Sequence, residues 1–149
     1  MTTSRRHVLV TDASRGSAVA FIRSLGRRGW RVTAADSHRG SAGFRSRYTT
    51  DRLVYPDPTR KADAAVAAIL DTVRRDRVDL VVPVTDEIGL PLARAREELA
   101  GQTCLALPDA EGQAIAHDKV RTLALAARLE VPIPPTVSVS TADEAVAAA

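Results

Sequence analysis

The sequence predicts an α/β domain built around a doubly wound, mainly parallel sheet of five strands. Short apolar, β-branched runs alternate with helical patterns from residue 7 to residue 107, and this alternation calls for right-handed crossovers between parallel strands. The run at residues 79–84 is almost entirely apolar, which is typical of a strand that helices cover on both faces. A chain of 149 residues can bury one such core but not two complete domains. We therefore expect one Rossmann-like domain followed by a truncated extension of helices and a short strand.

The first part of the pattern is a strand, a turn and a helix. Residues 7–11 are apolar and β-branched and predict the first strand, while residues 12–17 read as a turn into a helix. Apolar residues at helical spacing follow, and Gly29 supplies a stop. Residues 30–35 then predict a second strand, which ends at Asp36.

The middle of the chain supplies the remaining strands. Residues 37–48 are rich in serine, glycine and arginine without an apolar period, so we expect a mobile loop there. Residues 59–77 carry apolar side chains at helical spacing, which predicts the clearest helix of the chain. The other expected elements are strands at 52–55, 79–84 and 103–107, and a helix that begins by Pro91 and runs to Leu99.

The pattern changes after the fifth strand. Residues 118–129 predict a helix capped by its first residue, and the prolines of residues 131–136 enforce an extended segment. A short strand is expected at residues 137–139. Thr141 and Glu144 form a capping box that announces another helix. The sequence ends about two turns into that helix, which is marginal without packing partners, so we expect that further chain follows.

Charge is distributed unevenly along the chain. Residues 1–60 hold twelve basic and four acidic residues, a net charge of +8, whereas residues 61–149 have a net charge of −5. The arginines are scattered over predicted helix, loop and strand, and the chain has only two tyrosines, two phenylalanines and one tryptophan for stacking bases. Nucleic-acid binding is therefore not expected.

Composition also bears on the compartment. No apolar run reaches the roughly 18 to 20 residues that span a bilayer, and no apolar signal segment follows the first residues. We expect a cytoplasmic protein without a membrane partner. The single cysteine, Cys104, cannot form an internal disulfide and is expected to be a small buried hydrophobic residue.

The turn at residues 11–17 lies where doubly wound folds bind phosphates or small ligands. It resembles the short-chain dehydrogenase pattern TGxxxGxG, and Asp36 stands where those enzymes hold the adenosine ribose. Asp12 and Ala18 replace two of the three glycines, and a carboxylate at position 12 would repel a pyrophosphate. The chain also contains no Tyr-x-x-x-Lys pair. A tight turn without a dinucleotide is the favoured interpretation, and a dinucleotide-binding oxidoreductase of the short-chain dehydrogenase type is an alternative.

Four short motifs follow one another along almost the whole chain. They are VLVT at residues 8–11, PVTDE at 83–87, DK at 118–119 and EVPIPP at 130–135. Their order and spacing resemble the N-terminal portion of ATP-grasp ligases of the carbamoyl-phosphate-synthase-like and biotin-carboxylase-like kind. Glu130 stands where that family usually has glycine.

The resemblance implies a domain boundary and a set of sites. Residues 1–112 would be the pre-ATP-grasp domain, and residues 113–149 would begin the ATP-grasp nucleotide-binding region. In this family ATP phosphorylates a carboxylate, and an amine, a thiol or a similar nucleophile attacks the acyl phosphate. Lys119 matches a position that contacts ATP. The loops after the first and fourth strands would face the small-molecule carboxylate substrate, with Ser14, Arg15, Gly16, Asp86 and Glu87.

The chemical machinery of the family is not visible in this sequence. ATP and Mg²⁺ would serve the full-length parent, which needs a glycine-rich flap and Glu and Asn metal ligands. This chain has two lysines and neither a G-G-x-G flap nor a later carboxylate pair. No catalytic or metal-binding residue is assigned, and the chain alone is expected to be inactive and to bind no cofactor tightly. The remainder of the ATP-grasp domain is the implied partner, a homodimer is left open, and a stand-alone Rossmann-like binding module is a further alternative.

Overall fold

The structure, a computed structural model, describes residues 6–147. The chain divides into two compact units, Met1–Leu107 and Pro108–Ala149. Among the described residues, no helix is both long enough and apolar enough to cross a membrane.

The first unit is built on one five-stranded sheet in which all neighbouring strands are parallel. Its strands are β1 (His7–Val10), β2 (Arg31–Asp36), β3 (Asp51–Val54), β4 (Leu80–Val82) and β5 (Cys104–Leu105). Their spatial order is β3-β2-β1-β4-β5, which confirms the predicted doubly wound α/β fold. The chain leaves β1 toward β2 and β3 and returns to β4 on the other side. The point between β1 and β4 is therefore the topological switch point, where such folds open a ligand crevice.

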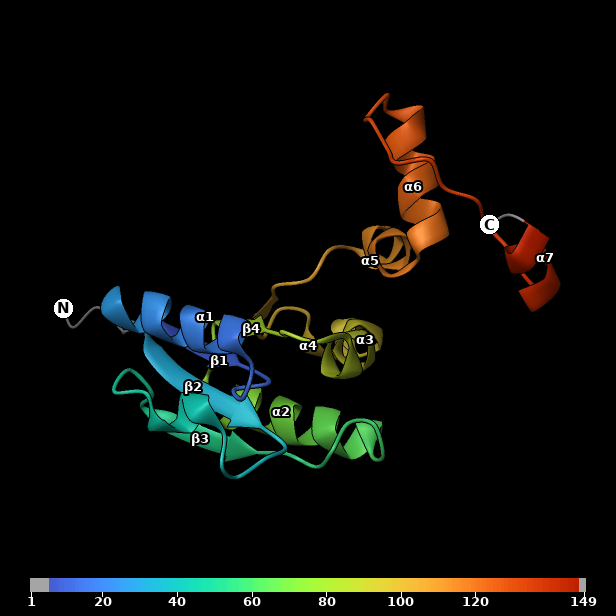
Figure 1. The fold of residues 1–149 in the computed structure, drawn as a ribbon. Helices are drawn as coiled ribbons and strands as arrows, with labels where there is room; N and C mark the ends of the chain where they lie inside the picture. Colours follow the sequence, from blue (N-terminus) through green and yellow to red (C-terminus); the bar gives the residue numbers. More distant parts are fainter. Residues whose placement is uncertain (1–5, 148–149) are drawn as a thin grey trace. The chain divides into compact units, whose positions relative to one another are not determined.

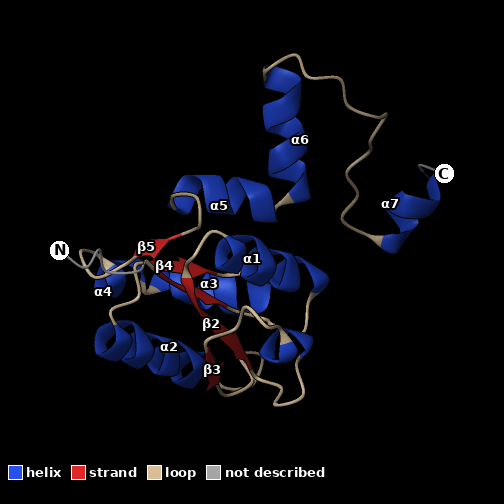
Figure 2. Cartoon of the chain, turned by 90° about the vertical axis from the view of Figure 1, so that its left-hand side faces the viewer, coloured by secondary structure: helices blue, strands red, loops and turns tan. Residues whose placement is uncertain are grey.

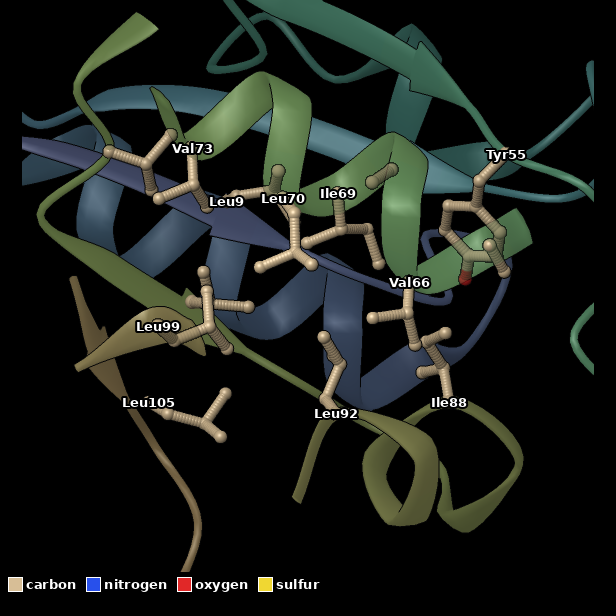
Figure 3. Close-up of a cluster of buried hydrophobic side chains, with 14 residues drawn as sticks. Leu9, Tyr55, Val66, Ile69, Leu70, Val73, Ile88, Leu92, Leu99 and Leu105 are labelled. Atoms are coloured by element: carbon tan, nitrogen blue, oxygen red, sulfur yellow. The ribbon is translucent and has the colours of Figure 1, made fainter. Parts of the chain in front are cut away.

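Helices cover both faces of the sheet, as Figures 1 and 2 show for α1 and α2. The helical elements of this unit are α1 (Gly16–Arg27), the 3-10 turn η1 (Ala42–Arg45), α2 (Ala62–Asp76), α3 (Asp86–Arg94) and α4 (Arg96–Leu99). Alternate residues of β1 serve opposite faces: Val8 and Val10 pack in the cluster under α1, whereas Leu9 packs in the cluster under α2 and α3. Figure 3 shows the second cluster, in which side chains of α2 meet Ile88 and Leu92 of α3. The near-continuous apolar runs of the sequence are explained by this two-sided burial.

Three expectations for the first unit need correction. Residues 37–48 are not an irregular loop throughout, because they contain η1, which buries Phe44 at 4% exposure in the cluster under α1. Cys104 is exposed: β5 is an edge strand, and its alternation turns Leu105 into the core and Cys104 to the opposite face. The helix expected up to Leu99 breaks at Ala95 into α3 and α4.

The second unit is helical and contains α5 (Ala110–His117), α6 (Lys119–Arg128) and α7 (Ala142–Ala147). Asp118 caps α6 as predicted, because its carboxylate accepts hydrogen bonds from the N–H groups of Val120 and Arg121. Helix α5 was not predicted from the sequence, and the strand expected at residues 137–139 is absent from this part of the described chain. None of residues 108–147 is buried, so this unit has no apolar core of its own.

Candidate functional site

The turns that follow β1 and β4 meet at the switch point of the sheet. The backbone N–H of Thr11 donates to the carbonyl of Val82 (3.1 Å), and the N–H of Val84 donates to the Thr11 hydroxyl (3.1 Å). Because β1 and β4 are parallel neighbours, their carboxyl ends open to the same edge of the sheet. The two loops predicted to face the substrate, after the first and fourth strands, are therefore joined by hydrogen bonds at one edge of the sheet.

The side chain of Asp12 connects the turns that follow β1 and β4. Its backbone has a φ of 53°, in the left-handed region that glycine usually occupies. Its carboxylate is buried and accepts hydrogen bonds from the Thr11 hydroxyl (2.6 Å), the Thr85 N–H (3.0 Å) and the Tyr55 hydroxyl (3.0 Å). One buried anion thus ties together the turn after β1, the turn after β4 and the end of β3.

Tyr55 is the buried partner that makes this arrangement possible. The residue directly follows β3 and is 2% exposed (Figure 3). Burial, and then the negative charge of Asp12, raise the pKa of the Tyr55 phenol well above its usual range. The phenol therefore stays protonated and donates to the carboxylate of Asp12. Sequence reasoning missed Thr11, Asp12 and Tyr55 as a unit, and the one available signal was a carboxylate where related turns have glycine.

Asp36, at the carboxyl end of β2, is a second buried anion beside the first turn. It is 4% exposed, and its two carboxylate oxygens accept from the backbone N–H groups of Ser14 (2.7 Å) and His38 (2.8 Å). These bonds fix the shape of the turn after β1. A carboxylate so enclosed and so bonded is poorly placed to receive the hydroxyl groups of a ribose.

The residues predicted to contact substrate lie in the turn after β1 and at the starts of α1 and α3. Ser14, Arg15, Gly16, Asp86 and Glu87 are all exposed. Hydrogen bonds from the Glu87 backbone and the Thr85 hydroxyl, and to a smaller extent the charge of Arg15, lower the pKa of the Glu87 carboxyl. No side chain caps α1, whose first turn contains no acid. That helix end consequently presents N–H groups toward the loop edge. Contact of these five residues with a substrate stays a prediction.

Lys119 belongs to the second unit, where it is the exposed first residue of α6. At the other end of α6, Glu130 has a φ of 56°, and the N–H of Val131 donates to the carbonyl of Ala126 (2.9 Å). This is the helix ending that a left-handed residue, usually glycine, provides. The backbone at position 130 therefore adopts a glycine-like conformation although the side chain is Glu.

Residues 6–147 contain no grouping of side chains suited to a metal ion. Within that range, no three His, Cys, Asp or Glu side chains lie close enough together to hold a metal ion. Lys119, the residue predicted to contact ATP, is the first residue of α6, and the described residues contain no cluster of carboxylates for Mg²⁺.

Comparisons with solved structures identify similar folds, although no protein-family model matches this chain and no curated protein matches it in sequence. The biotin carboxylase domain of a single-chain bacterial carboxylase matches 95% of this chain, with a TM-score of 0.66 and 26% sequence identity. The biotin carboxylase domain of a thermophilic 2-oxoglutarate carboxylase, bound to bicarbonate, matches 85% with a TM-score of 0.60 and 18% identity. BdcA (YjgI) from E. coli matches 84% with a TM-score of 0.51 and 20% identity, which shows the fold alone.

The biotin carboxylase matches cover most of this chain but only part of the matched chains. A match over 95% of the chain includes residues of the second unit, because the first unit ends at Leu107. In the other direction, this chain spans 33% and 28% of the two biotin carboxylase chains. The chain is thus similar to about a third of a biotin carboxylase domain, with both of its units included.

Proposed function

We propose that this chain is the N-terminal part of an ATP-grasp ligase that joins a carboxylate to an amine or a thiol through an acyl phosphate. In this proposal the first unit supplies the scaffold and the substrate loops, and the second unit begins the nucleotide-binding region. The observation that carries the proposal is the likeness to a biotin carboxylase domain over both units. Other enzymes share a doubly wound sheet, and BdcA also matches 84% of this chain, but with a lower TM-score of 0.51 and 20% identity.

The placement of the sequence motifs supports this assignment. The PVTDE motif at residues 83–87 forms the turn at the switch point, next to the turn after β1. The DK motif places a cap and then Lys119 at the start of α6. The residue before the Val-Pro segment, Glu130, has the backbone conformation of the glycine that the family usually carries there. These three motifs therefore have structural roles that fit the family pattern.

The second unit also supports a larger assembly. It exposes large apolar side chains that would ordinarily be covered. These are Val120, Leu129, Val131, Ile133, Val137, Val139 and Val146. Because a helical unit without buried residues gains little stability from packing, these side chains are expected to pack against the remaining part of an ATP-grasp domain.

The substrate edge has features that suit a carboxylate. The uncapped N-terminal end of α1 carries a partial positive charge, and Arg15 adjoins it. Hydrogen bonds from the Glu87 backbone and the Thr85 hydroxyl, and to a smaller extent the positive charge of Arg15, lower the pKa of the Glu87 carboxyl. In the proposed enzyme, Arg15 and the N–H groups of α1 would bind and orient a substrate carboxylate. No chemical step is assigned to the residues of this chain.

The oxidoreductase alternative is disfavoured by the same turn. A dinucleotide would place its pyrophosphate against the turn after β1 and its ribose against Asp36. In this structure Asp12 fills the turn with a buried negative charge, and Asp36 is engaged by Ser14 and His38. Both carboxylates, Asp12 and Asp36, are engaged in hydrogen bonds that hold the loops of the protein itself.

The test compares this chain with a polypeptide that continues beyond residue 149. The longer polypeptide should hydrolyse ATP when Mg²⁺ and a carboxylate are present, whereas the 149-residue chain should neither hydrolyse ATP nor bind it with micromolar affinity. Lys119 cannot hold ATP unaided, because an exposed ion pair contributes about 0 to 1 kcal/mol, while even millimolar affinity requires about 4 kcal/mol. Isothermal titration calorimetry with Mg·ATP and with NAD(H) makes the comparison.

Two variants on helix α6 test the role of Lys119, one at Lys119 itself and one, as a control, at Arg121. In the longer polypeptide, Lys119→Gln should weaken ATP binding about tenfold or more, as expected when a charge-assisted contact to phosphate is lost. Arg121→Gln, an exposed neighbour on α6, should change it by less than about twofold. Tight NAD(H) binding by the 149-residue chain would refute the ligase assignment and support the oxidoreductase.

A further inference from the structure

Arginines that lie far apart in the sequence gather at one place in the first unit. Arg23 and Arg27 are four residues apart on α1 and therefore share a face of that helix. Arg45 ends η1, and Arg47 lies in the segment that leads to β3. Together with Ser46 and Tyr48, these four arginines line a single pocket of about 410 Å³.

This arginine pocket lies at the edge of the sheet opposite the candidate substrate loops. Helix α1 runs back from the carboxyl end of β1, so its last turn reaches the amino-terminal edge, where β2 begins at Arg31. The segment at residues 45–50 directly precedes β3 and reaches the same edge. The arginine pocket is therefore separate from the turns that meet at Asp12.

The pocket is strongly and uniformly positive. No acidic side chain lines it, and the ion pairs formed within residues 6–147 involve other arginines: Arg31, Arg60 and Arg75. A second pocket shares Arg23 and Arg27 and adds Arg28. Guanidinium groups held together without carboxylates repel one another, so a bound anion would stabilise the arrangement.

Packing fixes the walls of the pocket before any ligand binds. A Cβ atom on Gly26 would lie 2.5 Å from the Cβ of Tyr48, so the absence of a side chain at this position lets the 45–48 segment close against α1. The Arg47 guanidinium stacks over the Tyr48 ring (4.9 Å) and donates to its hydroxyl (2.7 Å). Arg47, and to a lesser degree Arg27, lower the pKa of the Tyr48 phenol. The phenol oxygen is thus part of the same positive environment.

We propose that this pocket binds a small anion with two or more phosphoryl groups, such as pyrophosphate or the polyphosphate of a nucleotide. Guanidinium forks match phosphate oxygens in pairs, and four of them balance the several charges of a pyrophosphate. The pocket's volume suits a small ligand. Arg47 covers one face of the only aromatic ring in the lining, which leaves little room for stacking bases of a nucleic acid. The site is independent of the proposed ligase activity.

The experiment titrates the 149-residue chain with pyrophosphate in low salt and follows binding by calorimetry. The double variant Arg23→Gln/Arg27→Gln should weaken binding at least tenfold. The control Arg39→Gln/Arg52→Gln removes the same charge from two exposed arginines outside the pocket, and should change binding less than twofold. Equal loss in both variants, or no binding of pyrophosphate at millimolar concentration by the unchanged chain, would overturn the proposal.

Further titrations identify the part of the ligand that is recognised. Tripolyphosphate should bind at least as tightly as pyrophosphate, orthophosphate more weakly, and adenosine not at all, whereas ATP should follow its phosphates. A DNA duplex that binds more tightly than tripolyphosphate and is weakened equally by both double variants would show a nucleic-acid surface instead. Because ATP and the diphosphate of NAD(H) would enter this pocket through their phosphates, the ATP and NAD(H) titrations that test the ligase proposal are made in the Arg23→Gln/Arg27→Gln background. A failure of either proposal is then distinguishable from a failure of the other.

Discussion

Replacement of Asp12 by alanine is expected to lower the free energy of unfolding of the first unit by about 3 kcal/mol or more. The carboxylate is buried, and its removal leaves the N–H of Thr85 and the hydroxyl of Tyr55 without their acceptor. Alanine would also have to adopt the left-handed conformation at position 12, which costs an L-residue about 1 kcal/mol more. Urea unfolding followed by circular dichroism measures the change.

Two further variants separate the causes of this loss. Asp12→Asn keeps one acceptor oxygen and tolerates the left-handed conformation, so it should destabilise the fold by less than Asp12→Ala. Tyr55→Phe removes only the phenol hydroxyl, and its effect should not add to that of Asp12→Ala, because both delete the same hydrogen bond. Fully additive effects, or an Asp12→Ala variant as stable as the unchanged chain, would contradict the role given to this anion.

Substitution of Gly43 by alanine is expected to destabilise the first unit by about 2 kcal/mol through overpacking. A Cβ atom at this position would lie 2.8 Å from the Cβ and the carbonyl oxygen of Ala13 and 2.8 Å from the Cδ1 of Ile22. Ala13 belongs to the turn after β1 and is fully buried, so the strain would fall on the candidate substrate loop. The same unfolding measurement applies.

Gly40→Ala is the matched control in the same segment. Its nearest neighbour would be the Cε1 of His38 at 4.0 Å, an ordinary contact. This variant should leave stability unchanged or raise it slightly, because alanine reduces the freedom of the unfolded chain. If Gly43→Ala were as harmless as Gly40→Ala, the close packing of η1 against the first turn would be wrong.

The parts of the fold that could be predicted are those that depend on local pattern. β1 and β4 are short apolar runs because helices cover both sides of the sheet, and α2 is a regular apolar stripe because one face packs on that sheet. Asp118 was predicted as a cap because a cap depends only on the next three residues. Each of these features is determined by residues that lie within a few positions of one another in the sequence.

Other features depend on contacts between distant segments. Nothing near Asp12 in the sequence indicates Tyr55, 43 residues away, which supplies the hydroxyl for its carboxylate. Likewise the arginines of the pocket are spread along the sequence and converge only because α1 and the segment before β3 reach the same edge of the sheet. Cys104 was misjudged because its apolar run gives no sign that β5 is an edge strand.

The assignment of the second unit to a larger nucleotide-binding region is tested most directly by amide hydrogen exchange on the 149-residue chain. None of residues 108–147 is buried, so helix α6 should exchange within a short time, as a marginal helix does. Strands β1 and β4, which lie in the centre of the sheet, should exchange orders of magnitude more slowly. In a polypeptide that continues beyond residue 149, exchange in α6 should slow toward that of β4. Exchange in α6 of the 149-residue chain that is already as slow as in β4 would show a self-sufficient unit and contradict the account.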